Sequence, residues 1–235
     1  HNEHEVPYPN IITLNENAAI LHNTVPDKTA PAQHRSFLID AGANFNGYAA
    51  DITRTYALEQ NEYAEMVQAM DEVTLSLIDE LHPGCDYQNI HLSAHKKIAG
   101  LLTRFGVINL DEEDILQEGL VKTFFPHGIG HFLGLQVHDV AGLVADDHGT
   151  PKPAPDEHPF LRCTRMVEAN QIFTIEPGLY FIDSLLQDLK ASPKSKFINW
   201  DKVDQFRPFG GIRIEDNVIV HRDRNENMTR EAGLS

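Results

Sequence analysis

The chain has 235 residues, of which 41% are hydrophobic and 23% charged, and its formal net charge is −16 at pH 7. Phosphate binding needs clustered lysines and arginines, so this acidic balance argues against a nucleic-acid partner. The apolar content is sufficient for a large core, and the two cysteines, Cys85 and Cys163, are too few for a disulfide framework. The sequence contains no run of about 18 apolar residues, so we expect no membrane partner and predict a cytoplasmic protein.

Short apolar runs separated by breaker residues dominate the first part of the chain. The segments 10–15, 18–23 and 36–40 have this pattern, and each predicts a strand. The next stretch, "DAGANFNGYAAD", runs from Asp40 to Asp51 and contains Asn-Gly, a dipeptide that favours tight turns because both residues tolerate positive φ at low cost. We therefore predict a hairpin that carries one aspartate on each strand.

The next part of the chain has helical periodicity. Apolar residues of the segment 61–84 recur on one stripe, and the Pro-Gly dipeptide at its end is predicted to stop the helix. A second helix is predicted from about Gln88 to Phe105, and the short acidic segment 110–119 predicts a third. The methionines at helical spacing are interpreted as core residues.

Histidines and glycines are concentrated in the stretch "FFPHGIGHFLGLQVHD", which covers residues 124–139. The Pro-rich polar segment 146–159 predicts a surface loop. The segments 171–182 and 210–221 predict strands, with a helical or loop excursion over 183–202 between them. Strands near both ends of the chain, with helices between them, predict an α+β fold around an antiparallel or mixed sheet.

Four carboxylates and one imidazole lie in apolar strand or turn contexts: Asp40, Asp51, His131, Glu176 and Glu215. An isolated buried carboxylate is costly unless it is paired or binds a metal. Each of the five residues alone has an ordinary explanation, such as a turn residue, a solvent-facing strand end, an ion pair with a neighbouring arginine or a core histidine. Taken together, with few basic residues beside them, they indicate a cation site.

His127 and His131 are four residues apart, which is the spacing of paired histidines in a zinc-binding helix. The signature H-E-x-x-H is absent, however, because Gly128 and Gly130 interrupt the segment and oppose helix formation. We therefore predict a loop or strand in which the backbone approaches a site closely, with His138 on the following strand.

Four motifs together resemble the metallopeptidase family with the pita-bread fold: "DAGANFNGYAADITRTYA", "HGIGHFLGLQVHDVAG", "TIEPGLYF" and "FGGIRIEDNV". The resemblance is strongest to the bacterial Xaa-Pro dipeptidase (prolidase) and organophosphorus acid anhydrolase branch, and it includes the long insertion 149–171. It implies an α+β pita-bread domain over residues 1–235, with a curved, mostly antiparallel sheet backed by helices. Members of this branch have an N-terminal domain before the catalytic one, so we expect that this chain is the catalytic domain without it, with its start truncated.

The resemblance implies a metal centre with two divalent ions. Asp40 would chelate one ion, and His131 and Glu176 would hold the other. Asp51 and Glu215 would bridge both ions. Oxygen donors with one imidazole suit Mn²⁺, Co²⁺ or Fe²⁺ better than a His- or Cys-rich zinc site, and we expect manganese. A hydroxide that bridges two ions would attack the substrate carbonyl.

The resemblance also implies catalytic roles for other side chains. Glu176 would shuttle a proton from the attacking water, and His127 and His138 would contact the substrate and stabilise developing charge. Arg213 would lie close to the bridging glutamate and the substrate end. His22 would lie at the mouth of the pocket, where it is followed by asparagine in this chain and by tyrosine in relatives.

The predicted function is hydrolysis of Xaa-Pro dipeptides, which carry a C-terminal proline, by an enzyme that forms a homodimer at full length. A side activity on organophosphorus triesters is a second enzymatic interpretation. A non-catalytic peptide-binding relative and an inactive truncated fragment are further alternatives. All five ligand positions are present, which favours the enzyme, because a binding module would be free to lose them.

Overall fold

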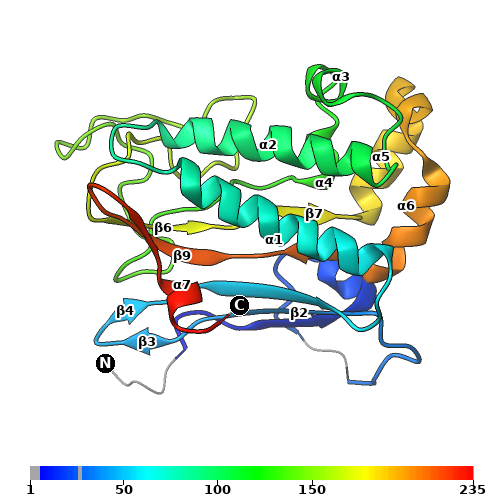
Figure 1. The fold of residues 1–235 in the computed structure, drawn as a ribbon, viewed down its shortest axis with the longest axis horizontal. Coiled ribbons are helices and arrows are strands. Elements are labelled where there is room, and N and C mark those ends of the chain that lie inside the picture. Colours follow the sequence, from blue (N-terminus) through cyan, green and yellow to red (C-terminus); the bar gives the residue numbers. More distant parts are fainter. Residues whose placement is uncertain (1–5, 26–27, 235) are drawn as a thin grey trace.

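Two three-stranded antiparallel sheets lie side by side beneath a layer of helices in the computed structural model, which describes residues 6–25 and 28–234 (Figure 1). The first sheet has the order β1-β2-β5 and the second β10-β9-β6. A bridge between Thr53 and Glu215 joins the two sheets. The strands are β1 (Ile11–Leu14), β2 (Ser36–Ala41), β5 (Ile52–Ala57), β6 (Gln171–Ile175), β9 (Asp216–Val220) and β10 (Asn225–Asn227). The predicted α+β class is confirmed.

Two small antiparallel strand pairs complete the strand set: the hairpin of β3 (Asn44–Phe45) with β4 (Tyr48–Ala49), and β7 (Gly178–Tyr180) with β8 (Gly211–Arg213), which are joined through the helical segment 181–210. The turn between β3 and β4 is the predicted Asn-Gly turn, and Asn46 and Gly47 have φ values of 50° and 86°. Positive φ at both central residues matches the twist of a two-residue hairpin.

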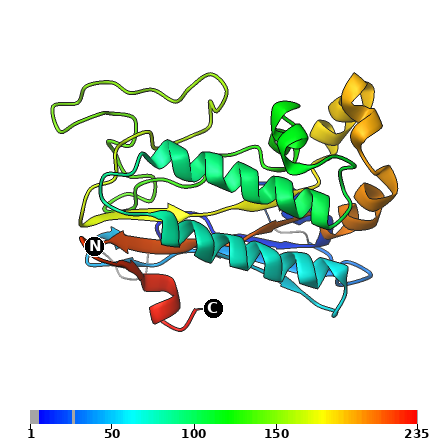
Figure 2. The same cartoon turned by 45° about the horizontal axis from the view of Figure 1, so that its top comes forward.

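Helices α1 (Glu62–Glu80) and α2 (Tyr87–Arg104) pack against each other on one face of the sheets (Figure 2). The side chains of Asn61 and Asp86 accept hydrogen bonds from backbone amides of the first turn and so cap the two helices. Both helices and the predicted third, α3 (Glu112–Gln117), lie where periodicity placed them. The shorter helices are α4 (Val121–Phe124), α5 (Asp183–Ala191), α6 (Trp200–Phe206) and α7 (Met228–Glu231).

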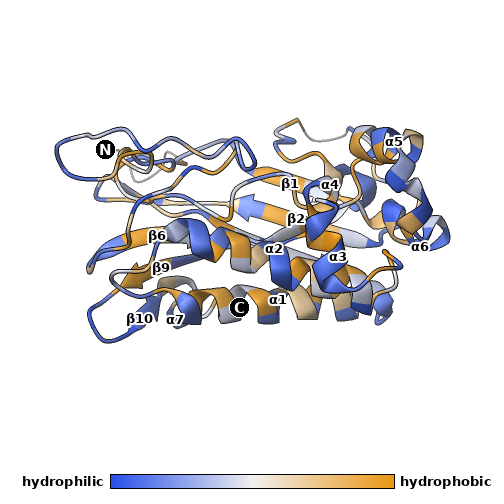
Figure 3. Ribbon diagram, turned by 90° about the horizontal axis from the view of Figure 1, so that it is seen from above, coloured by the Kyte–Doolittle hydropathy of each residue, from blue (hydrophilic) through white to orange (hydrophobic). Residues whose placement is uncertain are grey.

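The main hydrophobic core lies between these helices and the sheets. The apolar stripes that predicted α1 and α2 are buried in it, including Met66, Met70, Leu77, Ile90, Ala94 and Ile98. Figure 3 shows the same alternation along the helices, with apolar and polar positions on different faces. Burial of each large apolar side chain stabilises the fold by about 1.5–3 kcal/mol.

Two local predictions are wrong. Residues 18–23 do not form a strand, because a 3₁₀ helix (Asn15–Ala19) and a turn occupy this part of the chain. Asn15 adopts a φ of 56°, and its buried side-chain oxygen accepts from the backbone N–H of Arg35, which turns the chain away from β1. His138 lies in a bend rather than on a strand. The opening residues 1–5 lie outside the described part.

None of the helices in the described residues is both long enough and apolar enough to cross a bilayer.

Candidate metal centre

The five predicted ligands converge where the two sheets meet. Asp40 lies on β2, Asp51 immediately before β5, Glu176 after β6 and Glu215 before β9, and His131 comes from the Gly-rich segment. One ligand atom from each of Asp40, Asp51 and Glu215 lies within 4.8 Å of the others, and the same holds for His131, Glu176 and Glu215. The structure therefore brings together all five side chains that sequence reasoning selected.

Backbone hydrogen bonds hold the Gly-rich segment against β6. The amide of Thr174 donates to the carbonyl of His131 at 2.9 Å, and the amide of Glu176 donates to the carbonyl of Ile129 at 2.8 Å. Gly130 has a φ of 156°, and a Cβ there would lie 2.1 Å from the Thr174 oxygen. Only glycine permits this approach, so the predicted role of the glycines is confirmed at this position.

The His131 ring is oriented by its own backbone. Its Nδ1–H donates to the Phe132 carbonyl at 2.9 Å, because a carbonyl can only accept. The opposite nitrogen, Nε2, therefore faces the carboxylates, at 3.5 Å from Asp51 and 3.6 Å from Glu176. Burial opposes protonation of the ring, but the Asp51 hydrogen bond and the charge of Glu176 outweigh it and raise the pKa of His131. Release of the Nε2 proton would present a lone pair to a cation, which is the usual arrangement for a metal-binding histidine.

The centre holds more negative charge than the protein neutralises. Asp40, Asp51 and Glu215 are 7%, 6% and 2% exposed. Burial raises the pKa of Glu176 to about 7 and that of Glu215 well above its ordinary value, and it also raises the pKa of Asp40 despite its arginine partner. Burial opposes ionisation of Asp51 too, but hydrogen bonds from His131 and a tyrosine hydroxyl lower its pKa overall. Such uncompensated carboxylates indicate cation binding.

Arg213 contacts the centre from the side of β8. Its Nη2 donates to Asp40 at 2.6 Å, and its Nη1 donates to the Tyr180 hydroxyl at 3.2 Å. Its Nε donates to the Thr53 hydroxyl, which in turn donates to Glu215 at 2.7 Å. The ion pair is thus with Asp40 rather than with the neighbouring glutamate, and the link to Glu215 passes through Thr53.

His127 lies half-buried beside this arginine. Burial and the positive charge of Arg213 lower the pKa of His127 to about 3, so the ring is neutral at pH 7. Its Nδ1–H donates to the Gly128 carbonyl at 2.8 Å, and its Nε2 therefore accepts from the Tyr180 hydroxyl at 2.9 Å. Nδ1 also lies 3.7 Å from Glu176, which places His127 at the edge of the carboxylate cluster.

His138 and His22 lie at the exposed side of the centre. The His138 ring packs edge-on against His131, with centroids 4.4 Å apart. Burial and the charge of His131 lower the pKa of His138 to about 4. His22 is exposed and lies close enough to influence the pKa of both His127 and His138, in agreement with a position near the mouth.

Several residues of the centre escaped sequence analysis. The Tyr8 hydroxyl donates to Asp40 at 2.7 Å, and the Asn217 side chain accepts from the Asp51 backbone amide at 3.1 Å. Tyr180 connects His127 with Arg213. The sequence offered one signal for Tyr180, its place two residues after the Pro-Gly that follows Glu176, but none for Tyr8, which lies 32 positions before its partner.

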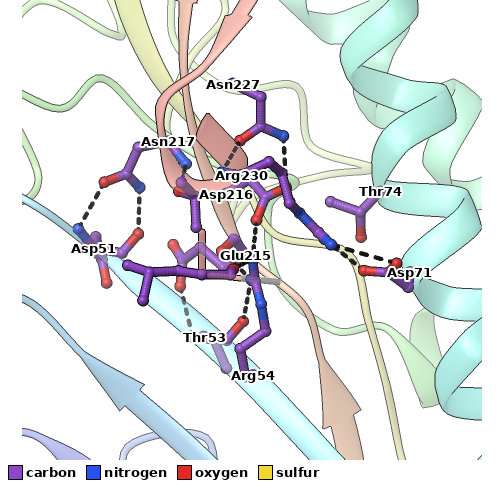
Figure 4. Close-up of polar contacts among 12 residues, drawn as sticks. Asp51, Thr53, Arg54, Asp71, Thr74, Glu215, Asp216, Asn217, Asn227 and Arg230 are labelled. Atoms are coloured by element: carbon purple, nitrogen blue, oxygen red, sulfur yellow. Dashed lines mark hydrogen bonds and ion pairs between the residues drawn. The ribbon is translucent and has the colours of Figure 1, made fainter. Parts of the chain in front are cut away.

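A second layer of charged side chains holds the strand that carries Glu215 (Figure 4). Arg54 donates to the backbone oxygen of Glu215 at 2.8 Å and pairs with Asp216 at 2.6 Å. Arg230 pairs with the other oxygen of Asp216 at 2.7 Å and also with Asp71 of α1. Buried charges that are paired and hydrogen-bonded are costly to disrupt, so this network fixes the position of Glu215.

The donor set fits hard divalent cations. It offers four carboxylates and one imidazole in a buried pocket, and among the described residues only Arg213 supplies a permanent positive charge in direct contact with them. Oxygen-rich sites of this kind suit manganese, iron or cobalt in the +2 state.

The model of the family described as Metallopeptidase family M24 matches residues 1–222. The chain is 66% identical over 237 residues to a Xaa-Pro dipeptidase of Pseudoalteromonas atlantica, covering 99% of this chain and 54% of the relative. It is 59% identical to a Xaa-Pro dipeptidase of Shewanella denitrificans, covering 98% and 52%. The chain thus spans about half the length of the curated relatives that it matches.

Solved structures of aminopeptidase P share the fold. A variant of the Escherichia coli enzyme matches with a TM-score of 0.74 and 26% identity, covering 98% of this chain and 46% of the other. Pseudomonas aeruginosa aminopeptidase PepP matches with a TM-score of 0.74 and 25% identity, covering 97% and 46%. The predicted pita-bread fold is confirmed by these neighbours.

Proposed function

Because the chain belongs to metallopeptidase family M24, we propose that it carries the catalytic centre of a Xaa-Pro dipeptidase that works with two divalent metal ions. The observation that carries the proposal is the convergence of four carboxylates and His131, in which Asp40, Asp51 and Glu215 are buried and His131 Nε2 faces Asp51 and Glu176. The curated relatives named Xaa-Pro dipeptidase support the substrate class. Manganese as the ion, a homodimer and a cytoplasmic location stay predictions.

Asp40, Asp51, His131, Glu176 and Glu215 would hold the ions. Two bound divalent ions supply a water that is nucleophilic at neutral pH and a Lewis acid for the substrate carbonyl. The protein contributes the orientation of the ligands, since the Phe132 carbonyl fixes the His131 ring and Thr53 donates to Glu215.

Glu176 is suited to carry a proton. Burial raises its pKa to about 7 before any cation is present, and a bound cation would lower that value. A carboxylate at the rim of the ligand cluster, 17% exposed, can receive a proton from water and deliver it to the leaving amine.

The neutral histidines face the same space. His127 is kept uncharged beside Arg213 and can hydrogen-bond a substrate amide or carboxylate. His138, more exposed and packed against His131, can donate to charge that develops on the substrate carbonyl oxygen. Tyr180 holds His127 and Arg213 in register, which favours a single substrate orientation.

The test is hydrolysis of matched peptides after loading with Mn²⁺. We expect cleavage of an Ala-Pro dipeptide and much slower release of alanine from Ala-Pro-Ala, with metal content measured on the same samples. Faster cleavage of the tripeptide would identify an aminopeptidase specificity instead. Two bound metal ions without cleavage of either peptide would favour the peptide-binding alternative.

A side activity on organophosphorus triesters belongs to the same proposal. The carboxylate centre that would activate water for a carbonyl can direct the same attack at a phosphoryl group, whose oxygen is also polarised by cations. Release of 4-nitrophenolate from diethyl 4-nitrophenyl phosphate tests it. Release that persists in Asp51→Asn would show that the reaction occurs elsewhere.

A further inference from the structure

Three histidines form a second cluster on the helix side of the molecule. His91 and His95 are one turn apart on α2, and His158 reaches them from the Pro-rich loop 144–170. All three ring pairs are in contact, with centroid distances of 4.5, 4.5 and 4.8 Å. The cluster lies outside the carboxylate centre and none of its members contributes to it.

The three rings offer metal-binding atoms to one point. One nitrogen from each ring lies within 4.8 Å of the other two, and His91 Nε2 is 3.0 Å from His158 Nδ1. Three nitrogens about 2.0–2.1 Å from a tetrahedral zinc ion lie roughly 3.4 Å from one another, so small ring rotations would complete the geometry. The i, i+4 spacing of His91 and His95 on α2 supports this arrangement, because it places both on one face.

Burial keeps the rings in the form that binds metals. His91 and His95 are 2% and 5% exposed. Burial, with the charges of neighbouring histidines and of Lys122, lowers the pKa of His91 to about 2 and that of His95 to about 3. The pKa of His158 is lowered by burial and Lys122, with a smaller opposite effect of Glu157. All three are therefore neutral at pH 7, and neutral imidazole is the ligand species.

Hydrogen bonds within the histidine cluster do not satisfy all of its ring nitrogens. A neutral ring has one donor and one acceptor. The bond between His91 and His158 uses one nitrogen of each, and the other nitrogen of His91, Nδ1, is buried without a protein partner. An unpaired buried polar atom costs about 1–3 kcal/mol, so hydrogen bonding alone does not account for the burial of these three rings together.

We propose that His91, His95 and His158 form a third metal site, which takes a borderline ion such as Zn²⁺ through three imidazole nitrogens and fastens the loop 144–170 to α2. The donor set separates it from the oxygen-rich centre, since imidazole suits zinc whereas carboxylates suit manganese. Lys122 opposes cation binding and Glu157 favours it. Water or another small ligand would complete a four-coordinate ion.

The proposed site fixes a loop that packs against the carboxylate centre. A Cβ on Gly128 would lie 2.8 Å from the Phe160 oxygen, two residues beyond His158. Phe125 connects the two regions, because its ring contacts both His91 and His127, with centroids 5.8 and 4.8 Å away. A metal ion bound by the three histidines would therefore hold in place the loop and the Phe125 ring that pack against the segment carrying His127.

Zinc titration of the chelator-stripped chain against a chromophoric competitor tests the proposal. We expect the unmodified chain to bind one more equivalent of Zn²⁺ than His158→Ala, while His148→Ala, an exposed histidine of the same loop, binds the same number as the unmodified chain. His91→Phe, which keeps a buried ring, should also lose that equivalent while its circular dichroism stays native. Asp51→Asn should retain it.

Limited proteolysis provides a readout independent of activity. Zn²⁺ should slow cleavage within the loop 144–170 by at least ~10-fold in the unmodified chain and in His148→Ala, but not in His158→Ala. Equal zinc stoichiometry and equal protection in the unmodified chain and His158→Ala would overturn the site. Loss of the additional equivalent in Asp51→Asn would also overturn it, because the ion would then belong to the carboxylate centre.

Discussion

The carboxylate centre and the histidine cluster are both buried and polar, but they solve opposite electrostatic problems. In the first, burial raises the pKa of Glu176 and Glu215 because their negative charge is poorly neutralised. In the second, burial lowers the pKa of His91 and His95, so no charge is present. The difference teaches that a cation would neutralise charge in the first region, whereas the second region is uncharged and has lone pairs to offer.

Removal of the Asp51 carboxylate should separate the two regions most strongly. Asp51→Asn should lower kcat/KM for an Xaa-Pro dipeptide by on the order of 10³-fold, because charge stabilisation in a water-poor site is lost together with a metal ligand. Metal analysis of the same sample should show loss of manganese and retention of zinc. Parallel loss of both metals would mean that the two regions are one coupled unit.

His138→Ala tests whether His138 contacts the substrate or binds a metal ion. We expect kcat to fall by on the order of 10²-fold with manganese content nearly unchanged, because His138 is assigned to the substrate and not to an ion. One of its ring nitrogens lies within 4.8 Å of a carboxylate oxygen of Asp51 and a ring nitrogen of His131. The alternative, that His138 binds a metal ion, can therefore be tested by metal analysis. Loss of metal in proportion to activity would make His138 a ligand.

Glu215→Gln should stabilise the metal-free chain at pH 7 by on the order of 2 kcal/mol, since it removes a buried carboxyl that ionises more readily in the unfolded chain, while the amide oxygen still accepts from Thr53. The pKa of Glu215 is raised in the folded state, so the stability contributed by its protonated form is complete below pH about 4.3 and is lost as pH rises through the folded value. The advantage of the variant, measured by urea unfolding with chelator present, should therefore shrink as pH falls from 7 to 5.

As pH falls, the histidine cluster should lower the free energy of unfolding, which is the opposite of the effect of Glu215. Because the pKa of His91 falls to about 2 and that of His95 to about 3, their contribution to stability is complete above pH about 6.5 and is lost as pH falls through the window down to 3. The loss is at most about 1.4 kcal/mol per pH unit for each ring. His91→Phe should lose less stability than the unmodified chain between pH 6 and 5. Equal slopes would show that His91 becomes charged without unfolding.

The carboxylate centre was predictable because its ligands carry strong local signals. Each acid follows or precedes an apolar strand, and the Asn-Gly turn places Asp40 and Asp51 on one hairpin. The family resemblance then assigned motifs that lie far apart in the sequence to one site, which periodicity alone could not do. Tyr8 and Asn217 had no such signal, since their roles depend on strand register.

The histidine cluster was missed for a different physical reason. His91 and His95 had helical spacing, but His158 lies 67 positions from His91 in a Pro-rich segment interpreted as a surface loop. Loop conformation is set by tertiary contacts rather than by periodicity. The wrong strand at 18–23 has a similar origin, because the capping contacts of Asn15 outweigh the apolar pattern that follows.

The bridge between Thr53 and Glu215 has a consequence for synthesis of the chain. The two residues touch although 162 positions separate them, so Glu215 is synthesised long after Thr53. A nascent chain therefore exposes Asp40 and Asp51 long before their partner glutamate exists, and non-local pairings of this kind form slowly. Full affinity for divalent ions can arise only after the segment that carries Glu215 has been synthesised and has paired with β5.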